Sequence, residues 1–230
     1  EIGSDHQIDY FSLIKQIEAL AIPYIQIRSC VINEFTFYES LISALNKSRV
    51  MSIELIIPFT KNEVSIDYMK NFVKRNLRIK MIIFHSSPFN KKIKIIENLS
   101  NIYYLSQKYN SVSDCGVISP KYFTVNMEYY TESLQHNSCL NRKISIDVDG
   151  EIKNCPSMPK SYGNIKNISL QEVIKNKSIA EMWHINKDAI DVCKDCEFRH
   201  LCTDCRAYIK NDKDFLSQPQ KCTYNPYIAK

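Results

Sequence analysis

Apolar residues in the first hundred positions alternate between helical and strand spacing. From Ile8 to Leu20 they recur at steps of three and four residues, which predicts an amphipathic helix that Pro23 ends. Short β-branched runs follow and predict strands. The predicted strands are Tyr24–Arg28, Met51–Phe59, Ile79–His85 and Ile102–Leu105.

Two further helices are predicted between these strands. One takes Asn33 as its cap and carries Phe37 and Leu41 on a single stripe. The other is capped near Ser65 and turns Met69 inward. Strands separated by helices predict a parallel sheet built from right-handed crossovers. Because the repeats are too few for a closed eight-stranded barrel, we expect an α/β fold with a partial, open (βα) barrel over residues 1–112.

The pattern changes after about residue 110. Lys143–Asp147 and Glu151–Asn154 alternate apolar and polar positions around Asp149-Gly150, which predicts a β-hairpin. Cys115–Ser119 is a short strand candidate. Two capping boxes, which begin at Ser169 and Ser178, predict two short helices. We therefore expect a second, smaller domain over residues 113–230.

Composition and charge exclude several classes of protein. A net charge of +5 comes from scattered lysines, which indicates solvated faces and no nucleic-acid surface. No uninterrupted apolar run is long enough to span a membrane, and even the segment Ile53–Phe59 is too short, so no membrane partner is expected. The nine cysteines are an odd number, which favours reduced thiols in a cytoplasmic protein over a secreted disulfide framework.

The cysteines of the second half form an ordered series. It runs Cys139-x10-Gly150-x4-Cys155, then Cys193-x2-Cys196-x5-Cys202-x2-Cys205, then Cys222. Thiolate is the soft ligand that iron–sulfur clusters and zinc select, so the spacing predicts a metal-built domain. The segment from Val192 to Cys222 has too little apolar content to fold alone, and metal binding would supply the missing free energy.

Less specific interpretations of the thiols remain open. Zinc is one, although the two C-x2-C pairs are closer together than in a zinc ribbon. Disulfides are another. Cys30, outside the series, is most simply a small buried hydrophobe at a strand end.

The sequence around these cysteines resembles a known family. The stretches that carry the resemblance are SCLNRKISIDVDGEIKNCPSM, GNI, VCKDCEFRHLCTDCRAY and CTYNPY. They are similar to the SPASM domain, and more specifically to the SPASM protein of grasp-with-SPASM peptide maturation systems. The resemblance covers residues 113–228 well. One departure is the gap between Cys202 and Cys205, which is two residues where the family usually has three.

The resemblance implies two 4Fe–4S clusters. The ligands implied for one are Cys193, Cys196, Cys202 and Cys222, and for the other Cys139, Cys155 and Cys205. The second group lacks a fourth ligand from the motif. Cys115 is the first candidate for it, and His136 and an open iron site are the alternatives.

A radical-SAM enzyme also needs C-x3-C-x2-C after its first strand, and no such triplet occurs in this sequence. If Glu1–Gly3 ends that strand, Ser4–Ile8 occupies the loop and contains no cysteine. The resemblance therefore implies a degenerate radical-SAM-like barrel that does not use S-adenosylmethionine. No glycine-rich phosphate loop exists either, so the chain is not itself an ATP-using ligase.

The implied function is that of an accessory maturase. It would act with an ATP-grasp ligase on a ribosomally made precursor peptide, and no catalytic residue is assigned. The alternatives are a redox-active iron–sulfur enzyme and a structural zinc module. Three other residues have plainer interpretations: His85 lies in a loop at a strand end, His200 is exposed between ligands, and Trp183 serves packing.

Overall fold

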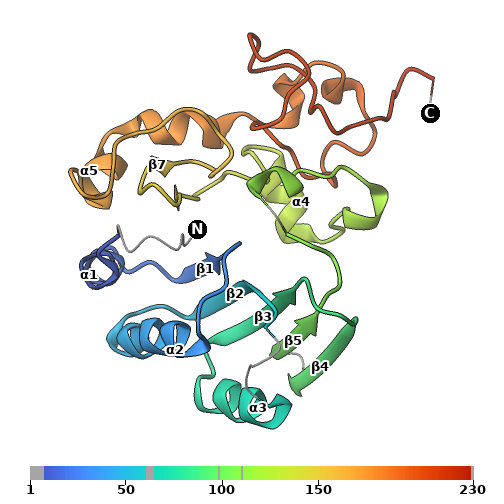
Figure 1. The fold of residues 1–230 in the computed structure, drawn as a ribbon. Helices are drawn as coiled ribbons and strands as arrows, with labels where there is room; N and C mark the ends of the chain where they lie inside the picture. The colour runs from blue at the N-terminus through green and yellow to red at the C-terminus, as the bar shows by residue number, and fades with distance from the viewer. Residues whose placement is uncertain (1–7, 61–64, 98, 110, 229–230) are drawn as a thin grey trace. The chain divides into compact units, whose positions relative to one another are not determined.

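The protein is described by a computed structural model over residues 8–60, 65–97, 99–109 and 111–228. The predicted cysteine-free loop at Ser4–Ile8 therefore lies almost entirely outside the described residues. The chain divides into two compact units (Figure 1). Unit 1 comprises Glu1–Ser111, Asp147–Gly150 and Asn164–Gln171, and unit 2 comprises Val112–Ile146, Glu151–Gly163 and Glu172–Lys230.

Unit 1 contains a five-stranded sheet in the order β1-β2-β3-β5-β4. The strands are β1 (Tyr24–Arg28), β2 (Ser52–Pro58), β3 (Ile79–His85), β4 (Lys91–Ile96) and β5 (Ser100–Tyr104). All neighbours pair in parallel except β4, which pairs antiparallel with β5. The α/β class and the parallel sheet are thus confirmed. β1 and β4 are the outer strands in this order, and a radical-SAM-like barrel remains a prediction.

Strand β4 was not expected from the sequence, and one expected strand is absent. β4 reads KKIKII, so its lysines hide the strand pattern, and of its residues only Ile93 is fully buried. Cys115–Ser119 forms no strand, and the prediction there is wrong. Gly116 in this segment has φ +81°, which is incompatible with extended strand geometry.

Three helices accompany the sheet: α1 (Tyr10–Ala19), α2 (Phe35–Ala44) and α3 (Ile66–Arg75). The Asp9 carboxylate caps α1 and the Ser65 hydroxyl caps α3, so the cap predicted near Ser65 is confirmed. The Asn33 cap is wrong by one residue, because Glu34 precedes α2 and makes no side-chain cap bond. The Asn33 amide instead lies within hydrogen-bonding distance of the Tyr38 hydroxyl.

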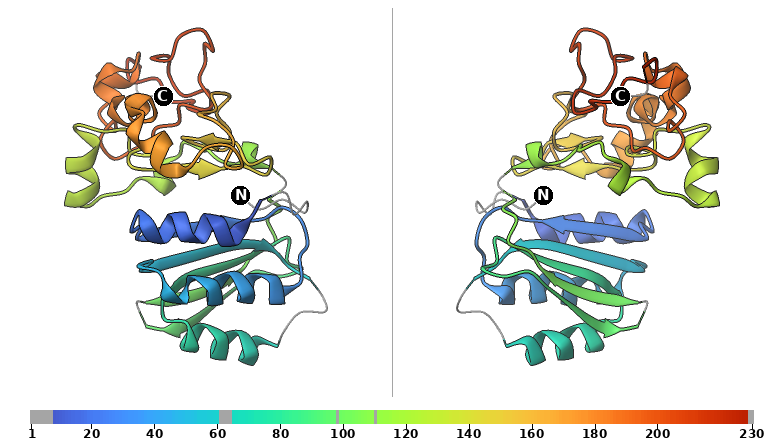
Figure 2. Two further views of the ribbon diagram at one scale, coloured as in Figure 1. Left: turned by 90° about the vertical axis from the view of Figure 1, so that its left-hand side faces the viewer. Right: turned by 90° about the vertical axis from the view of Figure 1, so that its right-hand side faces the viewer.

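The core of unit 1 lies between the sheet and its helices. Register places one buried aliphatic residue of each strand side by side. This row is Ile27, Leu55, Ile82, Ile102 and Ile93. Helices α2 and α3 lie on one face of the sheet (Figure 2), where Tyr38 and Met69 are almost fully buried. Full burial of each such side chain stabilises the fold by about 1.5–3 kcal/mol.

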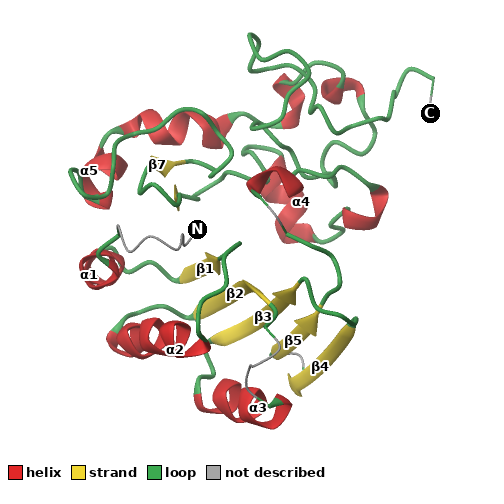
Figure 3. Ribbon diagram, in the orientation of Figure 1, coloured by secondary structure: helices red, strands yellow, loops and turns green. Residues whose placement is uncertain are grey.

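The second half of the chain has little regular structure (Figure 3). Its elements are α4 (Met127–Ser133), β6 (Ser145–Ile146), β7 (Ile152–Lys153), α5 (Leu170–Lys175) and short 3₁₀ helices. The 3₁₀ helices from Val112 onward are η2 (Val112–Asp114), η3 (Pro120–Tyr122), η4 (Lys177–His184), η5 (Lys187–Ala189) and η6 (Cys193–Asp195), and η1 (Leu45–Lys47) lies in unit 1.

Two predictions in this half can be compared with the structure directly. The predicted hairpin is confirmed as the antiparallel pair β6–β7, with Gly150 at φ +85° in its turn. The Ser178 capping box is wrong, because the Asn176 side chain accepts the bond from the Ser178 amide and opens a 3₁₀ helix. In the part of the chain that the structure describes, no helix is long and apolar enough to cross a membrane.

Candidate metal centre

All nine cysteines are free thiols. Cys30 lies just after β1 in unit 1, and the other eight belong to unit 2. Cys193 and Cys202 are buried, Cys115 is exposed, and the rest of the eight are half-buried. The candidate metal ligands are therefore concentrated in unit 2, which has less regular secondary structure than unit 1.

We call set A the four thiols that the resemblance implies as ligands of one cluster: Cys193, Cys196, Cys202 and Cys222. Burial is the main cause that raises the pKa of Cys193, Cys196 and Cys202, and neighbouring thiols add to it. The Cys222 thiol further raises the pKa of Cys193 and of Cys202, and the Cys202 thiol further raises the pKa of Cys196. Cys222 therefore lies near Cys193 and Cys202, and Cys202 lies near Cys196.

We call set B the three thiols implied as ligands of the second cluster, with the candidate fourth ligand: Cys139, Cys155, Cys205 and Cys115. Burial raises the pKa of the Cys139 thiol to about 11, with Lys143 opposing and Cys155, Cys115 and Cys205 adding to the rise. Cys155 also acts on Cys205, whose pKa is raised mainly by burial. Cys115, the first candidate for a fourth ligand, thus lies near Cys139.

The raised pKa values limit what these thiols can do without a metal. Burial raises the pKa of Cys193 to about 12, so this thiol and Cys139 are protonated at neutral pH. A protonated, buried thiol is a poor nucleophile. Metal binding would displace the protons, and the metal–thiolate bonds would offset that cost. The arrangement therefore favours metal ligation over thiol catalysis.

Local turns place the set A thiols. The Cys196 amide donates to the Cys193 carbonyl at 3.0 Å, and the Cys202 amide donates to the Phe198 carbonyl at 3.0 Å. Val192, just before the first thiol, has φ +66°. A β-branched residue in this region is strained. The chain tolerates this strain at the point where it enters the cysteine loop.

A buried ion pair lies beside both sets. Asp204 stands between Cys202 and Cys205, and its side chain and that of Arg206 are 1% and 0% exposed. Arg206 Nη2 donates to Asp204 Oδ1 at 2.8 Å, and Nε lies 2.7 Å from Oδ2 without hydrogen-bond alignment. Arg206 Nη1 donates to the Phe215 and Ser217 carbonyls at 2.8 Å each. The pair thereby ties the tail to the cysteine loop.

Asn137 connects this ion pair to the start of the hairpin segment. Its Oδ1 accepts the Cys139 and Leu140 amides at 3.0 and 2.9 Å, and its Nδ2 donates to Asp204 Oδ2 at 2.6 Å. Nδ2 also donates to the Ile185 carbonyl at 3.1 Å. Because Asn137 is fully buried, it positions Cys139 relative to the loop that carries Cys202 and Cys205.

A buried lysine contacts set A. Lys187 is 6% exposed, and its Nζ donates to Cys202 Sγ at 3.1 Å. Burial by itself disfavours the ammonium form. Interactions with Cys202, Asp204 and Cys193 outweigh burial, so the pKa of Lys187 lies above its ordinary value. The side chain is therefore a cation at neutral pH.

A glycine lies against the sulfur of a set B thiol. A Cβ placed on Gly116 would lie 2.9 Å from Cys205 Sγ and 3.3 Å from Tyr208 Cδ2. With φ +81°, Gly116 also occupies the left-handed region that other residues avoid. The backbone next to Cys115 therefore approaches Cys205 in a way that a side chain would prevent.

These residues fit a metal–sulfur group. Two groups of soft donors are present, and the buried atoms Trp183 Nε1 and His136 Nδ1 have no hydrogen-bond partner in the described structure. Trp183 packs in the same apolar cluster as Cys139 and Cys155, so sulfides of a cluster there could accept its N–H. The fit is one of donor chemistry, because among the described residues no three or more His, Cys, Asp or Glu side chains are arranged to hold a metal ion.

The remaining residues singled out from the sequence have structural roles. Buried His85 donates from Nε2 to the Ser29 carbonyl at 3.0 Å and accepts from the Ser86 hydroxyl at Nδ1. The exposure predicted for His200 is wrong: its side chain is 12% exposed and lies 3.6 Å from Asp188. His136 packs against His184 with ring centroids 5.2 Å apart.

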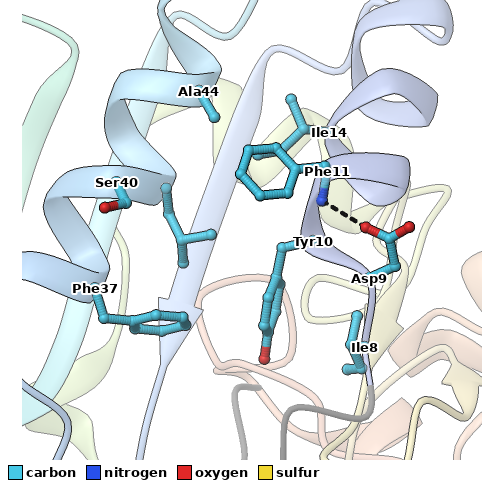
Figure 4. Close-up of a pocket in the computed structure, with 9 residues that line it drawn as sticks. Ile8, Asp9, Tyr10, Phe11, Ile14, Phe37, Ser40 and Ala44 are labelled. Carbon is cyan, nitrogen blue, oxygen red and sulfur yellow. Dashed lines mark hydrogen bonds between the residues drawn. The ribbon is translucent and has the colours of Figure 1, made fainter.

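A hollow of about 250 Å³ lies between α1 and α2 in unit 1 (Figure 4). Its lining is mostly apolar, with Tyr10, Phe11 and Phe37 among the residues drawn. The Asp9 carboxylate at its rim accepts the Phe11 amide as a helix cap. The hollow thus lacks the convergent polar groups that a ligand site needs.

Sequence reasoning missed four residues of the centre: Asn137, Lys187, Asp204 and Arg206. The sequence indicated Asp204 and Arg206 only weakly: Asp204 lies between Cys202 and Cys205, and Arg206 directly follows Cys205. It did not indicate Asn137 or Lys187, because only the folded chain shows that they are buried.

Comparison with known proteins supports this description. Residues 138–197 match the family model of SPASM, an iron–sulfur cluster-binding domain. The match includes Cys139, Cys155, Cys193 and Cys196. No curated protein and no solved structure matches the sequence. The chain therefore contains a SPASM iron–sulfur cluster-binding domain at residues 138–197.

Proposed function

We propose that the protein is an accessory peptide maturase that carries two 4Fe–4S clusters. Set A would hold one and set B, completed by Cys115, the other. The observation that supports the proposal is the match of residues 138–197 to an iron–sulfur cluster-binding domain, together with eight free thiols in unit 2. When bound, such clusters would cross-link the loops and could store electrons.

The protein would not cleave S-adenosylmethionine. The sequence has no C-x3-C-x2-C triplet, which that chemistry requires. Unit 1 would then be a degenerate radical-SAM-like half-barrel that serves for binding. In keeping with the grasp-with-SPASM resemblance, the partners would be a ribosomally made precursor peptide and an ATP-grasp ligase.

The edge of the sheet at β1 is the proposed peptide-binding element. A peptide can add to an exposed edge strand through main-chain hydrogen bonds. The opposite edge, β4, carries the exposed lysines Lys91, Lys92 and Lys94, which discourage such pairing. β1 reads YIQIR and has no lysine. Of the two edges, β1 is therefore better suited to receive a strand.

Calorimetry with the precursor peptide, and separately with the ligase, tests the proposal. Binding to at least one is expected, and Tyr24→Lys at the start of β1 should weaken peptide binding. Tyr24 is 68% exposed, so the fold should tolerate the change. Leu77→Lys, at a 60% exposed position off the edge, is the matched control. Failure to bind either partner while the clusters are intact would refute the proposal.

A second candidate is a redox-active enzyme that modifies the peptide at an open iron of set B. The exposure of Cys115 favours it, because an exposed ligand can give way to a substrate group. A change in product formation by Cys115→Ser, in a variant that still folds, would support this candidate. Zinc without sulfide after anaerobic purification would instead indicate a structural zinc module.

A further inference from the structure

Lys187 is an unusual residue to find beside a set A thiol. Lysine is almost never fully buried unless it is paired. Here the ammonium is 6% exposed and lies 3.1 Å from Cys202 Sγ, in the 3₁₀ turn η5 that directly precedes the cysteine loop. The fold therefore accepts a substantial desolvation cost to bring a cation to one sulfur.

Asp204 helps to stabilise the Lys187 ammonium, but this carboxylate already has a cationic partner. Arg206 already neutralises Asp204, and its donors are directed to Asp204 and to the Phe215 and Ser217 carbonyls. Lys187 is thus a positive charge beyond that pair. An ammonium has three protons to donate. Within the described chain one hydrogen bond is found for them, to Cys202 Sγ.

The lysines described beside set B are placed differently. Lys143 acts on Cys139 from an exposed position. Lys221 donates to the Ser113 and Cys115 carbonyls, not to a sulfur. Lys187, by contrast, is buried and donates to a cysteine sulfur. The two sets therefore differ in their electrostatic surroundings.

We propose that Lys187 tunes the reduction potential of the set A cluster and makes it the more easily reduced of the two. This inference rests on the proposed function. Reduction adds one electron, supplied by an external reductant such as dithionite, and no bond forms or breaks. Lys187 keeps its protons, and its charge and hydrogen bond stabilise the more negative reduced form more than the oxidised form.

Anaerobic dithionite titration of the full chain, followed by electron paramagnetic resonance, tests the inference. Lys187→Met should lower the reduction equilibrium constant of one couple at least about tenfold, which is about 59 mV for one electron. Lys187→Arg should recover most of the loss. Lys194→Met removes a half-exposed charge from the same loop and should change neither couple more than about twofold. Cys222→Ser assigns the affected couple to set A.

Each other outcome has a defined meaning. Because Lys187→Met could lose iron, Lys187→Gln provides a second neutral variant for the same titration. If either neutral variant keeps its iron and its couple stays within about twofold of wild type, the inference is overturned. If both neutral variants lose half of their iron while Lys187→Arg keeps all of it, Lys187 is needed to hold the cluster. That result would also overturn the inference that Lys187 tunes the reduction potential. A wild-type protein that purifies without iron would refute the proposed function itself.

Discussion

Replacement of Gly116 by alanine tests whether Cys115 and Cys205 hold a common metal group. The added Cβ would lie 2.9 Å from Cys205 Sγ, closer than real Cβ atoms approach other heavy atoms. Either the Cys205 sulfur or the backbone beside Cys115 must therefore move. Since both thiols belong to set B, the change is aimed at that set alone.

The magnitude has two parts. An alanine in the left-handed region costs about 1–2 kcal/mol relative to glycine. Displacement of Cys205 should add a loss of metal ligation. Gly150→Ala isolates the first part, because Gly150 has φ +85° and its added Cβ would meet the Asn164 side chain at 3.1 Å, not a cysteine. The two variants thus share the backbone strain and differ at the thiol.

Iron and acid-labile sulfide after anaerobic purification, together with urea unfolding, provide the assay. Wild type and Gly150→Ala should each contain about eight irons, and Gly116→Ala should approach about four. Gly116→Ala should also lose more stability than Gly150→Ala. Equal iron content and equal stability in the two variants would show that the approach of Gly116 to Cys205 has no part in metal binding.

Three further predictions follow from the same centre. Cys115→Ser should remove about half of the iron while Cys30→Ser removes none, and unchanged iron in Cys115→Ser would exclude it as a ligand. Asn137→Ala should destabilise the protein by about 2–4 kcal/mol in urea unfolding, because it leaves buried partners unsatisfied; a loss below about 1 kcal/mol would contradict that role. Chelation of iron should expose residues after 112 to limited proteolysis and leave the sheet of unit 1 protected, and the reverse order would contradict metal-dependent folding.

Much of the secondary structure of unit 1 could be predicted, because it follows from short-range sequence patterns. The runs at β1, β2 and β3 are β-branched and bounded by turns or helical stripes, so propensity and periodicity agree. Strand β4 was not predicted, because the sequence of an edge strand rich in lysine resembles that of a solvated loop. The cap of α2 was misplaced by one residue, since the Asn33 amide lies near Tyr38 and not at the helix terminus.

The centre in unit 2 could be predicted only in part. Cysteine spacing identified the donors, but spacing alone does not say which thiols meet, and the division into two sets came from resemblance. The buried pair Asp204–Arg206 could not be recognised, because single charges in a polar loop look solvated until the fold encloses them. The same holds for Lys187, whose neighbours in sequence give no sign of its contact with Cys202.

The order of the thiols along the chain has a consequence for biogenesis. Cys205 of set B precedes Cys222 of set A, so a nascent polypeptide presents all four set B sulfurs to the cell before it presents the last sulfur of set A. Cofactor loading during translation could thus begin with set B. Set A would wait until Cys222 has also left the ribosome.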